Sequence, residues 1–220
     1  MLKQLRKLVY VANKQLHRHG LTDANWGNVS GIDRERGLVV AKPGDVPCKE
    51  LTADDMLIID MHGQVKDGEG TPAADILTQL HLYKTFPDIG GITFLHSAWA
   101  MVFAQAGLEI TPFGLKHTRH FRGAIPCTRL LSDDEVRELY TEGVGHVIAE
   151  AFAKTDPMTT PAVLVQQYAP FTWGESPSHA VSHAAALDKV AKLAYHTSLL
   201  GLANKRKLLP VSDSFYNMRG

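Results

Sequence analysis

A short apolar segment led by two glycines is the feature that most limits how this chain can fold. Residues 90–96 read Gly-Gly-Ile-Thr-Phe-Leu-His, which is too apolar for a strand with one solvent-exposed face, so we expect a strand in the centre of a sheet. Apolar residues at helical spacing predict a helix over residues 73–86, which Pro87 stops. This unit predicts an α/β fold that brings Asp75, at the helix start, and His96, at the strand end, to one mouth of the sheet, where chemistry usually sits.

The same periodicities predict the other elements. We expect helices over residues 2–19, 98–106, 133–153 and 176–203, and strands over residues 37–41, 56–60, 124–128, 162–166 and 171–173. The helix over residues 133–153 is expected because Ser132, followed three residues later by Glu135, forms a capping box. We find no internal repeat, low-complexity segment or linker, so residues 1–220 are predicted to form one domain.

Charge and hydropathy exclude several classes of partner. The 23 basic and 23 acidic residues balance to zero net charge, which disfavours nucleic acid. No apolar run approaches a membrane span, and the first 20 residues form a charged amphipathic stretch rather than a signal peptide, so we expect no membrane partner and a cytoplasmic location. The two cysteines, Cys48 and Cys127, are expected to be free thiols.

Several blocks of residues resemble the L-ribulose-5-phosphate 4-epimerase branch of the class II aldolase/adducin family. They are Trp26-Gly27-Asn28-Val29-Ser30, Lys42-Pro43, Leu51-Thr52-Ala53-Asp54-Asp55-Met56, Asp75, Gly90-Gly91-Ile92, His96-Ser97, Gly123-Ala124-Ile125-Pro126-Cys127-Thr128-Arg129 and Pro170-Phe171-Thr172-Trp173-Gly174. The resemblance runs in register from about Leu2 to Leu200. It implies a class II aldolase/adducin-like three-layer fold, with a central mixed sheet flanked by helices, and a homotetramer whose active site lies near a subunit interface.

The resemblance also implies a metal site, and this chain departs from it. In active members three histidines hold a divalent metal, usually zinc, which leaves a position open for substrate oxygens and stabilises an enediolate while the C3–C4 bond is broken and remade. The first two ligands form His-x-His, which reads Phe94-Leu95-His96 here, and the third position holds Tyr168. One imidazole cannot replace three.

Phosphate and acid/base positions have changed in the same way. The family's Lys-Pro-Ser-Gly loop reads Lys42-Pro43-Gly44-Asp45, which removes a hydroxyl donor and adds a carboxylate that repels a phosphate. Ala73 and Ala74 stand in place of paired phosphate-binding serines. Arg119 stands at the acid/base aspartate and cannot accept a proton at neutral pH. Tyr216 does not match the partner tyrosine of the family's C-terminal tail convincingly.

Two hypotheses follow. In the first, the chain is an epimerase/aldolase scaffold, engineered or degenerate, that has lost its native zinc, phosphate and acid/base residues and carries a new metal or small-molecule site in the old pocket. The pocket residues expected for it are Asn28, Lys42, Asp75, Trp99, Arg119 and Tyr168. In the second, the chain is an active metal-dependent epimerase or related aldolase in which His96, His117 and His120 form an altered ligand set for a divalent metal.

Each candidate residue also has a purely structural explanation. Asp75 can cap the helix that begins beside it. His96 can be a buried histidine bonded to the backbone, and Trp99 can be part of the core. His117 and His120 can belong to a basic, solvated surface.

Overall fold

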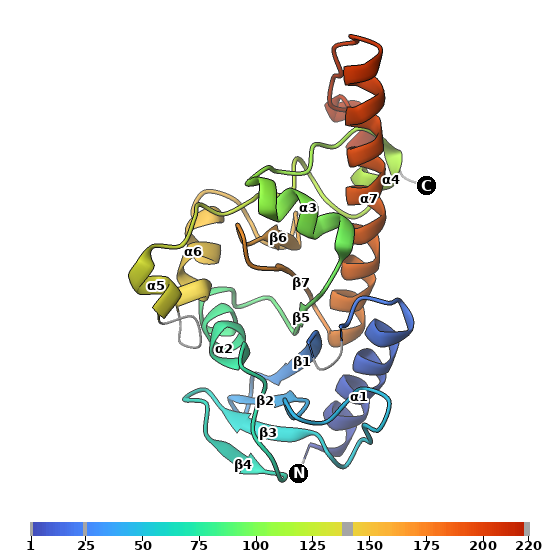
Figure 1. Cartoon of the computed structure of the whole chain (residues 1–220). Helices are drawn as coiled ribbons and strands as arrows, with labels where there is room; N and C mark the ends of the chain where they lie inside the picture. Colours follow the sequence, from blue (N-terminus) through green and yellow to red (C-terminus); the bar gives the residue numbers. More distant parts are fainter. Residues whose placement is uncertain (1, 24–25, 138–142, 218–220) are drawn as a thin grey trace.

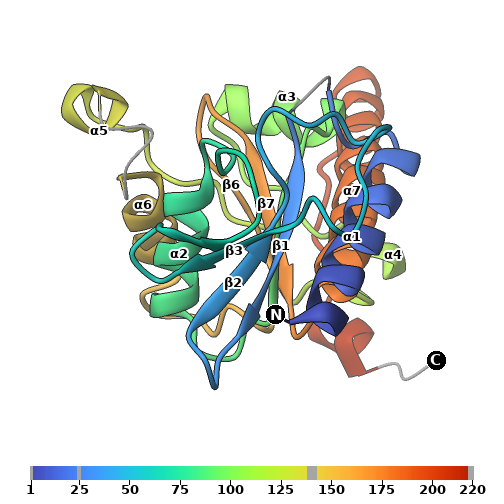
Figure 2. The same ribbon diagram turned by 90° about the horizontal axis from the view of Figure 1, so that it is seen from below.

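A seven-stranded sheet runs through the middle of the molecule, with helices on both faces (Figures 1 and 2). The computed structural model describes residues 2–23, 26–137 and 143–217. The strands, in the order β4-β3-β2-β1-β5-β7-β6, are β1 (Asn28–Asp33), β2 (Leu38–Ala41), β3 (Leu57–Asp60), β4 (Val65–Asp67), β5 (Gly91–Phe94), β6 (Ala162–Leu164) and β7 (Pro170–Gly174). The helices are α1 (Lys3–Arg18), α2 (Ile76–Thr85), α3 (Ala98–Ala106), α4 (Leu115–Thr118), α5 (Asp133–Arg137), α6 (Gly143–Ala151) and α7 (Pro177–Ala203), followed by the 3-10 helix η1 (Asp213–Asn217).

Alternation of side chains along the strands divides the core between the two faces of the sheet. Val39 and Ile59 pack toward α2 and α6, whereas their neighbours Val40 and Ile58 pack toward α1. Figure 2 shows α1 and α7 on one side of the sheet and α2 and α6 on the other. The three-layer α/β arrangement expected from the sequence, a central sheet flanked by helices, is confirmed.

Strand β5 lies at the centre of the sheet, as its composition predicted. It pairs with β1 on one side and with β7 on the other, and its four residues are all buried. The two glycines at its start allow a close crossing, because a Cβ on Gly91 would lie 2.4 Å from the backbone nitrogen of Pro177 at the start of α7. The double glycine thus lets the longest helix begin directly against the central strand.

The pairing within the sheet is antiparallel along every described ladder, and a parallel pairing occurs in the isolated bridge between Cys127 and Leu164.

The prediction of a strand over residues 124–128 is wrong. Its residues make isolated bridges, from Ile125 to Ile110 and from Cys127 to Leu164. Ile125 and Cys127 thus pair with two different segments, so no continuous ladder forms over these residues.

The single helix expected over residues 133–153 is also wrong. Its capping box is present, since Glu135 N donates to Ser132 Oγ (3.2 Å) and Ser132 N donates to Glu135 Oε2 (2.8 Å). However, a Cβ on Gly143 would lie 3.4 Å from the carbonyl oxygen of Glu135, whereas eight residues of one helix span about 12 Å. Helices α5 and α6 are therefore separate, and residues 138–142 between them lie outside the described residues.

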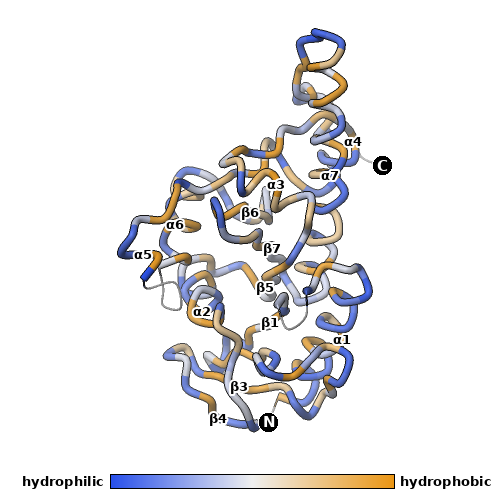
Figure 3. Tube along the Cα trace, in the orientation of Figure 1, coloured by the Kyte–Doolittle hydropathy of each residue, from blue (hydrophilic) through white to orange (hydrophobic). Residues whose placement is uncertain are grey.

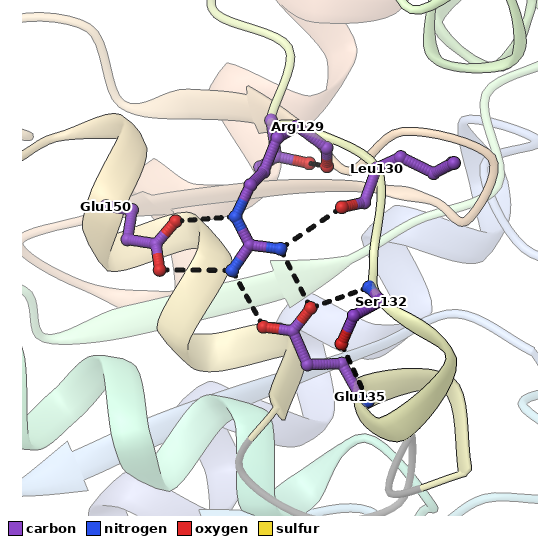
Figure 4. A network of polar contacts seen from close by, with 6 residues as sticks. Arg129, Leu130, Ser132, Glu135 and Glu150 are labelled. Carbon is purple, nitrogen blue, oxygen red and sulfur yellow. Dashed lines mark hydrogen bonds and ion pairs between the residues drawn. The ribbon is translucent and has the colours of Figure 1, made fainter.

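Arg129 joins these two helices to the loop that precedes them. Its guanidinium contacts Glu135 of α5 and Glu150 of α6, with nitrogen–oxygen distances between 2.8 and 3.1 Å (Figure 4). Arg129 also lowers the pKa of Glu135 to about 2, with the backbone N–H of Ser132 as the next cause. The residues drawn in Figure 4 thus fix α5 beside α6 although both helices are short.

Helix α7 projects beyond the sheet at its C-terminal end (Figure 1). Hydrophobic positions, orange in Figure 3, continue into this projecting part. Leu200 and Leu202 there are 66% and 79% exposed. In the described part of the chain, no helix is long and apolar enough to cross a membrane, and Cys48 and Cys127 are free thiols as expected.

Candidate functional site

A cavity of about 250 Å³ lies where the starts of β1 and α2 meet the end of β5. Its lining residues are Trp26, Gly27, Asn28, Gly44, Ala73, Ala74, Asp75 and Phe94. The predicted pocket residues Asn28 and Asp75 therefore meet in one cavity, beside the two alanines that stand in place of serines. A larger cavity of about 570 Å³ lies beside the N-terminal end of α1, but none of the predicted site residues lines it.

The polar wall of the pocket is a chain of side-chain hydrogen bonds. Asn28 Nδ2 donates to Asp75 Oδ1 at 2.7 Å, and Gln79 Nε2 donates to Asn28 Oδ1 at 2.7 Å. Gln79 also donates to Asp75 and accepts from Ser30. Ser30 Oγ lies 2.9 Å from the hydroxyl of Tyr83, which places both hydroxyls within hydrogen-bond distance. The network runs from the pocket into the interior along the α2 face of the sheet.

Asp75 belongs to this network and does not cap the helix. It occupies the N-cap position of α2, but its side chain makes no capping hydrogen bond. Burial raises the pKa of its carboxyl group, while hydrogen bonds from Gln79 and Asn28 and the charge of Lys42 act in the opposite direction. The pocket therefore presents a carboxyl group whose proton is held more tightly than that of an exposed aspartate.

Lys42 is buried, two residues before Gly44 of the cavity lining. Its ammonium donates to the carbonyl oxygens of Pro43 (2.7 Å) and Val46 (2.8 Å). Burial lowers its pKa, with the neighbouring Cys48, Asp75 and Asp45 acting in the opposite direction. The ammonium group that the family resemblance assigns to phosphate binding is thus hydrogen-bonded to two backbone carbonyl oxygens.

Aromatic rings occupy the positions that the resemblance assigns to two metal-binding histidines. The rings of Phe94 and Tyr168 stack with centroids 5.9 Å apart and an interplanar angle of 29°. Phe171 packs against both, at 5.1 Å from Phe94 and 6.5 Å from Tyr168. Trp26 extends this aromatic wall at the cavity, 6.3 Å from Phe94.

His96 stands at the edge of the aromatic wall. Its ring lies 5.8 Å from that of Phe94 and 6.0 Å from that of Trp26. Burial lowers the pKa of the imidazole, with Asp23 acting in the opposite direction, so the neutral form is favoured at neutral pH. The imidazole can therefore donate or accept a hydrogen bond beside the aromatic wall, although it does not line the cavity itself.

The residues of this site do not fit the tris-histidine zinc centre of the family. One imidazole is present, and the other two positions carry stacked rings that bring no ligand nitrogen. Across residues 2–23, 26–137 and 143–217, no group of three or more His, Cys, Asp or Glu side chains is arranged to hold a metal ion. The proposed set of His96, His117 and His120 is not gathered within this chain.

The remaining predicted site residues lie away from the cavity lining. Trp99 packs against α7, with its ring 5.7 Å from that of Tyr195 and 5.2 Å from the Nζ of Lys192. His117 is buried on α4, and its Nε2 lies 2.7 Å from the carbonyl oxygen of Gly123. His120 lies beside α7, with its ring 6.3 Å from that of His183.

Arg119 follows helix α4 and its side chain is exposed. The same loop is tied to the C-terminal segment, because the backbone nitrogen of Gly123 donates to the hydroxyl of Tyr216 at 3.0 Å. Tyr216 therefore holds the loop that follows α4.

Three members of the polar network, Gln79, Ser30 and Tyr83, were not predicted as site residues from the sequence. Their spacing carried a signal. Gln79 lies four residues after Asp75 on one helix face, and Ser30 lies two residues after Asn28 on one strand face. A buried glutamine on an otherwise apolar face needs polar partners.

The comparisons with known proteins agree with this fold. The family model "Class II Aldolase and Adducin N-terminal domain" matches residues 7–195. A solved L-fuculose 1-phosphate aldolase is similar with a TM-score of 0.82 and 19% identity, covering 98% of this chain and 93% of that one. YgbL from Escherichia coli, described as a putative aldolase/epimerase/decarboxylase, is similar with a TM-score of 0.74 and 21% identity, covering 98% and 97%.

An L-fuculose 1-phosphate aldolase from Glaciozyma antarctica PI12 has a TM-score of 0.75 and 17% identity, with 99% of this chain and 82% of that one covered. At these identities the solved structures establish the fold, and the family model covers most of the sequence. The chain therefore belongs to the class II aldolase and adducin family.

Proposed function

We propose that this chain is a class II aldolase scaffold whose old active-site pocket now binds a small organic molecule. It would not carry out metal-dependent sugar-phosphate chemistry. The stacked rings of Phe94 and Tyr168, at positions that the resemblance assigns to metal ligands, are the observation that carries the proposal. Replacements at metal, phosphate and acid/base positions together support a site that was rebuilt or lost, by engineering or by natural divergence.

The pocket walls favour a small, mostly apolar ligand with one polar group. Trp26 and Phe94 offer ring surface, and Ala73, Ala74 and Gly44 leave space without offering hydroxyl groups. Asp75 and Asn28 form the polar end, where a ligand N–H or O–H can donate to the carboxylate. At about 250 Å³, the cavity is smaller than the usual range of about 300–1,000 Å³ for drug-sized ligands, which points to a ligand of roughly one ring.

Two measurements test the proposal. In the first, a panel of neutral one-ring compounds that carry an N–H or O–H donor, such as phenol and indole, is titrated by calorimetry into the native chain. We expect saturable binding by at least one compound, and Asp75→Ala should weaken it about ten- to hundredfold, since a hydrogen bond to a charged group contributes about 1.5–3 kcal/mol. Asp88→Ala, an exposed carboxylate outside the pocket lining, should leave it unchanged.

The second measurement addresses the alternative, an active epimerase or aldolase with an altered ligand set. The chain is assayed with L-ribulose 5-phosphate in the presence of added zinc, and we expect no turnover. Turnover at an ordinary enzymatic rate, about 1–1,000 per second, would refute the proposal. The proposal would also be refuted if none of the one-ring compounds bound to the native chain.

The proposal also includes the branch of the family, the oligomeric state and the location of the protein. The motif blocks support descent from the epimerase branch. The exposed Leu199, Leu200 and Leu202 on the projecting end of α7, of which Leu199 and Leu202 share one helix face, support burial of that end in a homotetramer, since grouped exposed apolar side chains mark an interaction site. Light scattering should give the tetramer mass for the native chain and a smaller mass for Leu200→Glu with Leu202→Glu. We place the protein in the cytoplasm, as one domain.

A further inference from the structure

A second, chemically different hollow lies between α1, α4 and α7. It has a volume of about 440 Å³, within the range of about 300–1,000 Å³ found for small-molecule sites. Its floor is built from the small residues Ala185 and Ala186 of α7. Lys116 of α4 and Lys189 of α7 line it, together with His120 and His19. We name it the α4–α7 groove.

The charged side chains that line the α4–α7 groove are both lysines. Its lining contains two lysines and two histidines, and no aspartate or glutamate. The positive charges of Lys116, Arg119 and Lys189 each lower the pKa of His120, after burial and His183 as the larger causes. These cations therefore lie close enough to act on the same group.

The two lysines of the groove are not paired directly with a described carboxylate. Neither Lys116 nor Lys189 takes part in an ion pair within residues 2–23, 26–137 and 143–217. Two carboxylates of the same region have other contacts, because Asp188 accepts a hydrogen bond from Ser97 at 2.7 Å and Glu175 lies 3.9 Å from His179. A chain with zero net charge thus carries a local excess of positive charge over one concave surface.

We propose that the α4–α7 groove binds a phosphate monoester, with Lys116 and Lys189 holding the phosphate from two different elements. The hydroxyl groups of Ser178 and Ser182, which also line the groove, are suited to donate to phosphate oxygens. The apolar floor then contacts the organic part of the ligand. The site is distinct from the aromatic pocket, because the two cavities share no lining residue.

A small phosphate compound fits this groove better than a polyanion does. Binding to nucleic acid rests on many phosphate contacts along an extended basic surface, and the whole chain has equal numbers of acidic and basic residues. Two lysines at one hollow match a single dianionic group. The groove therefore selects for one phosphate on a compact molecule.

Calorimetry with glycerol 3-phosphate tests the proposal directly. Inorganic phosphate and glycerol serve as the two partial ligands, and the native chain is used at low ionic strength, because salt screens exposed charges. We expect saturable 1:1 binding of glycerol 3-phosphate, weaker binding of inorganic phosphate and none of glycerol. Lys116→Gln and Lys189→Gln should each weaken the affinity about two- to fivefold, and the double variant further.

A matched control uses Lys154→Gln, which removes one exposed lysine outside the groove and should leave the affinity unchanged. Since Lys116 and Lys189 are exposed, all the variants should fold like the native chain. Absence of saturable binding by the native chain would overturn the proposal. This holds also where the cause is a second copy of the chain that covers the groove. An equal loss of affinity in Lys154→Gln would also overturn it, because it would show general charge attraction rather than a site.

Discussion

Asn28 and Asp75 are 47 residues apart in the sequence, and in the folded chain the side-chain amide of one donates to the carboxyl group of the other at 2.7 Å. The contact joins the first residue of β1 to the residue before α2, and both side chains line the same cavity. Asp75, one of the residues that carry the family resemblance, is thus held in place in the pocket by buried hydrogen-bond partners.

Removal of the Asp75 carboxyl group should destabilise the fold. Asp75→Ala leaves one N–H of Asn28 and one of Gln79 without their acceptor in a buried environment. We expect the free energy of unfolding to fall by about 1–3 kcal/mol, the usual effect of a buried unsatisfied polar group. Urea denaturation measures it, and Asp88→Ala, at an exposed position, should change it by less than about 0.5 kcal/mol. Equal effects of the two substitutions would contradict the network described above.

The raised pKa of Asp75 predicts the sign of a pH dependence. The folded chain binds this proton more tightly than the unfolded chain, in which the pKa is near 3.8. The contribution of Asp75 to the free energy of unfolding therefore falls as pH rises from the unfolded pKa through the folded one. The side chain introduced by Asp75→Asn cannot ionise, so the variant lacks this pH-dependent contribution.

The measurable quantity is the free energy of unfolding of the native chain minus that of Asp75→Asn. It should decrease as pH rises from about 4 through the folded pKa, and then level off. Subtraction of the variant removes the titration of the other carboxylates. A difference that increases with pH would show that Asp75 is stabilised as an anion in the folded state.

Two substitutions should restore a zinc site. Phe94→His together with Tyr168→His places imidazoles at both positions that the resemblance assigns to metal ligands, beside His96. Three neutral imidazoles with one open position suit zinc, so the double variant should retain about one zinc ion per chain after dialysis. Elemental analysis measures the stoichiometry.

The matched control adds His96→Ala to that double variant and should abolish zinc retention. Each single variant should retain less zinc than the double one. Because Phe94 is 2% exposed and lies in the core, circular dichroism should confirm folding before the metal is counted. Equal zinc content in the native chain and the double variant would refute the assignment of these positions.

The close crossing of β5 and α7 predicts a sharp difference between two glycines. A Cβ on Gly91 would lie 2.4 Å from the backbone nitrogen and 2.5 Å from the Cα of Pro177, so α7 must shift to admit it. Gly91→Ala should lower the free energy of unfolding by about 1–3 kcal/mol or more, the effect of overpacking a core. Gly114→Ala meets no atom within 4 Å and should be nearly neutral. Thermal unfolding of both variants compares them, and similar midpoints would refute the crossing.

The sequence by itself determined the layers of this protein and the identity of its central strand. Residues 90–96 are apolar throughout, which requires cover on both faces, and the helical spacing of residues 73–86 supplies part of that cover. Local chemistry also predicted the capping box at Ser132 and the helix start at Ser176 and Pro177, because each depends on residues within one turn of the chain.

Tertiary structure decided the rest, because the deciding contacts join residues far apart in sequence. The helix expected over residues 133–153 is broken, and Arg129 holds its parts through Glu135 and Glu150. Asp75 could equally cap a helix or face a pocket, and its contact with Asn28 settled that. Trp99, expected in the pocket, packs on α7 instead. Residue types determine which chemistry is available, whereas long-range packing determines which of those groups meet.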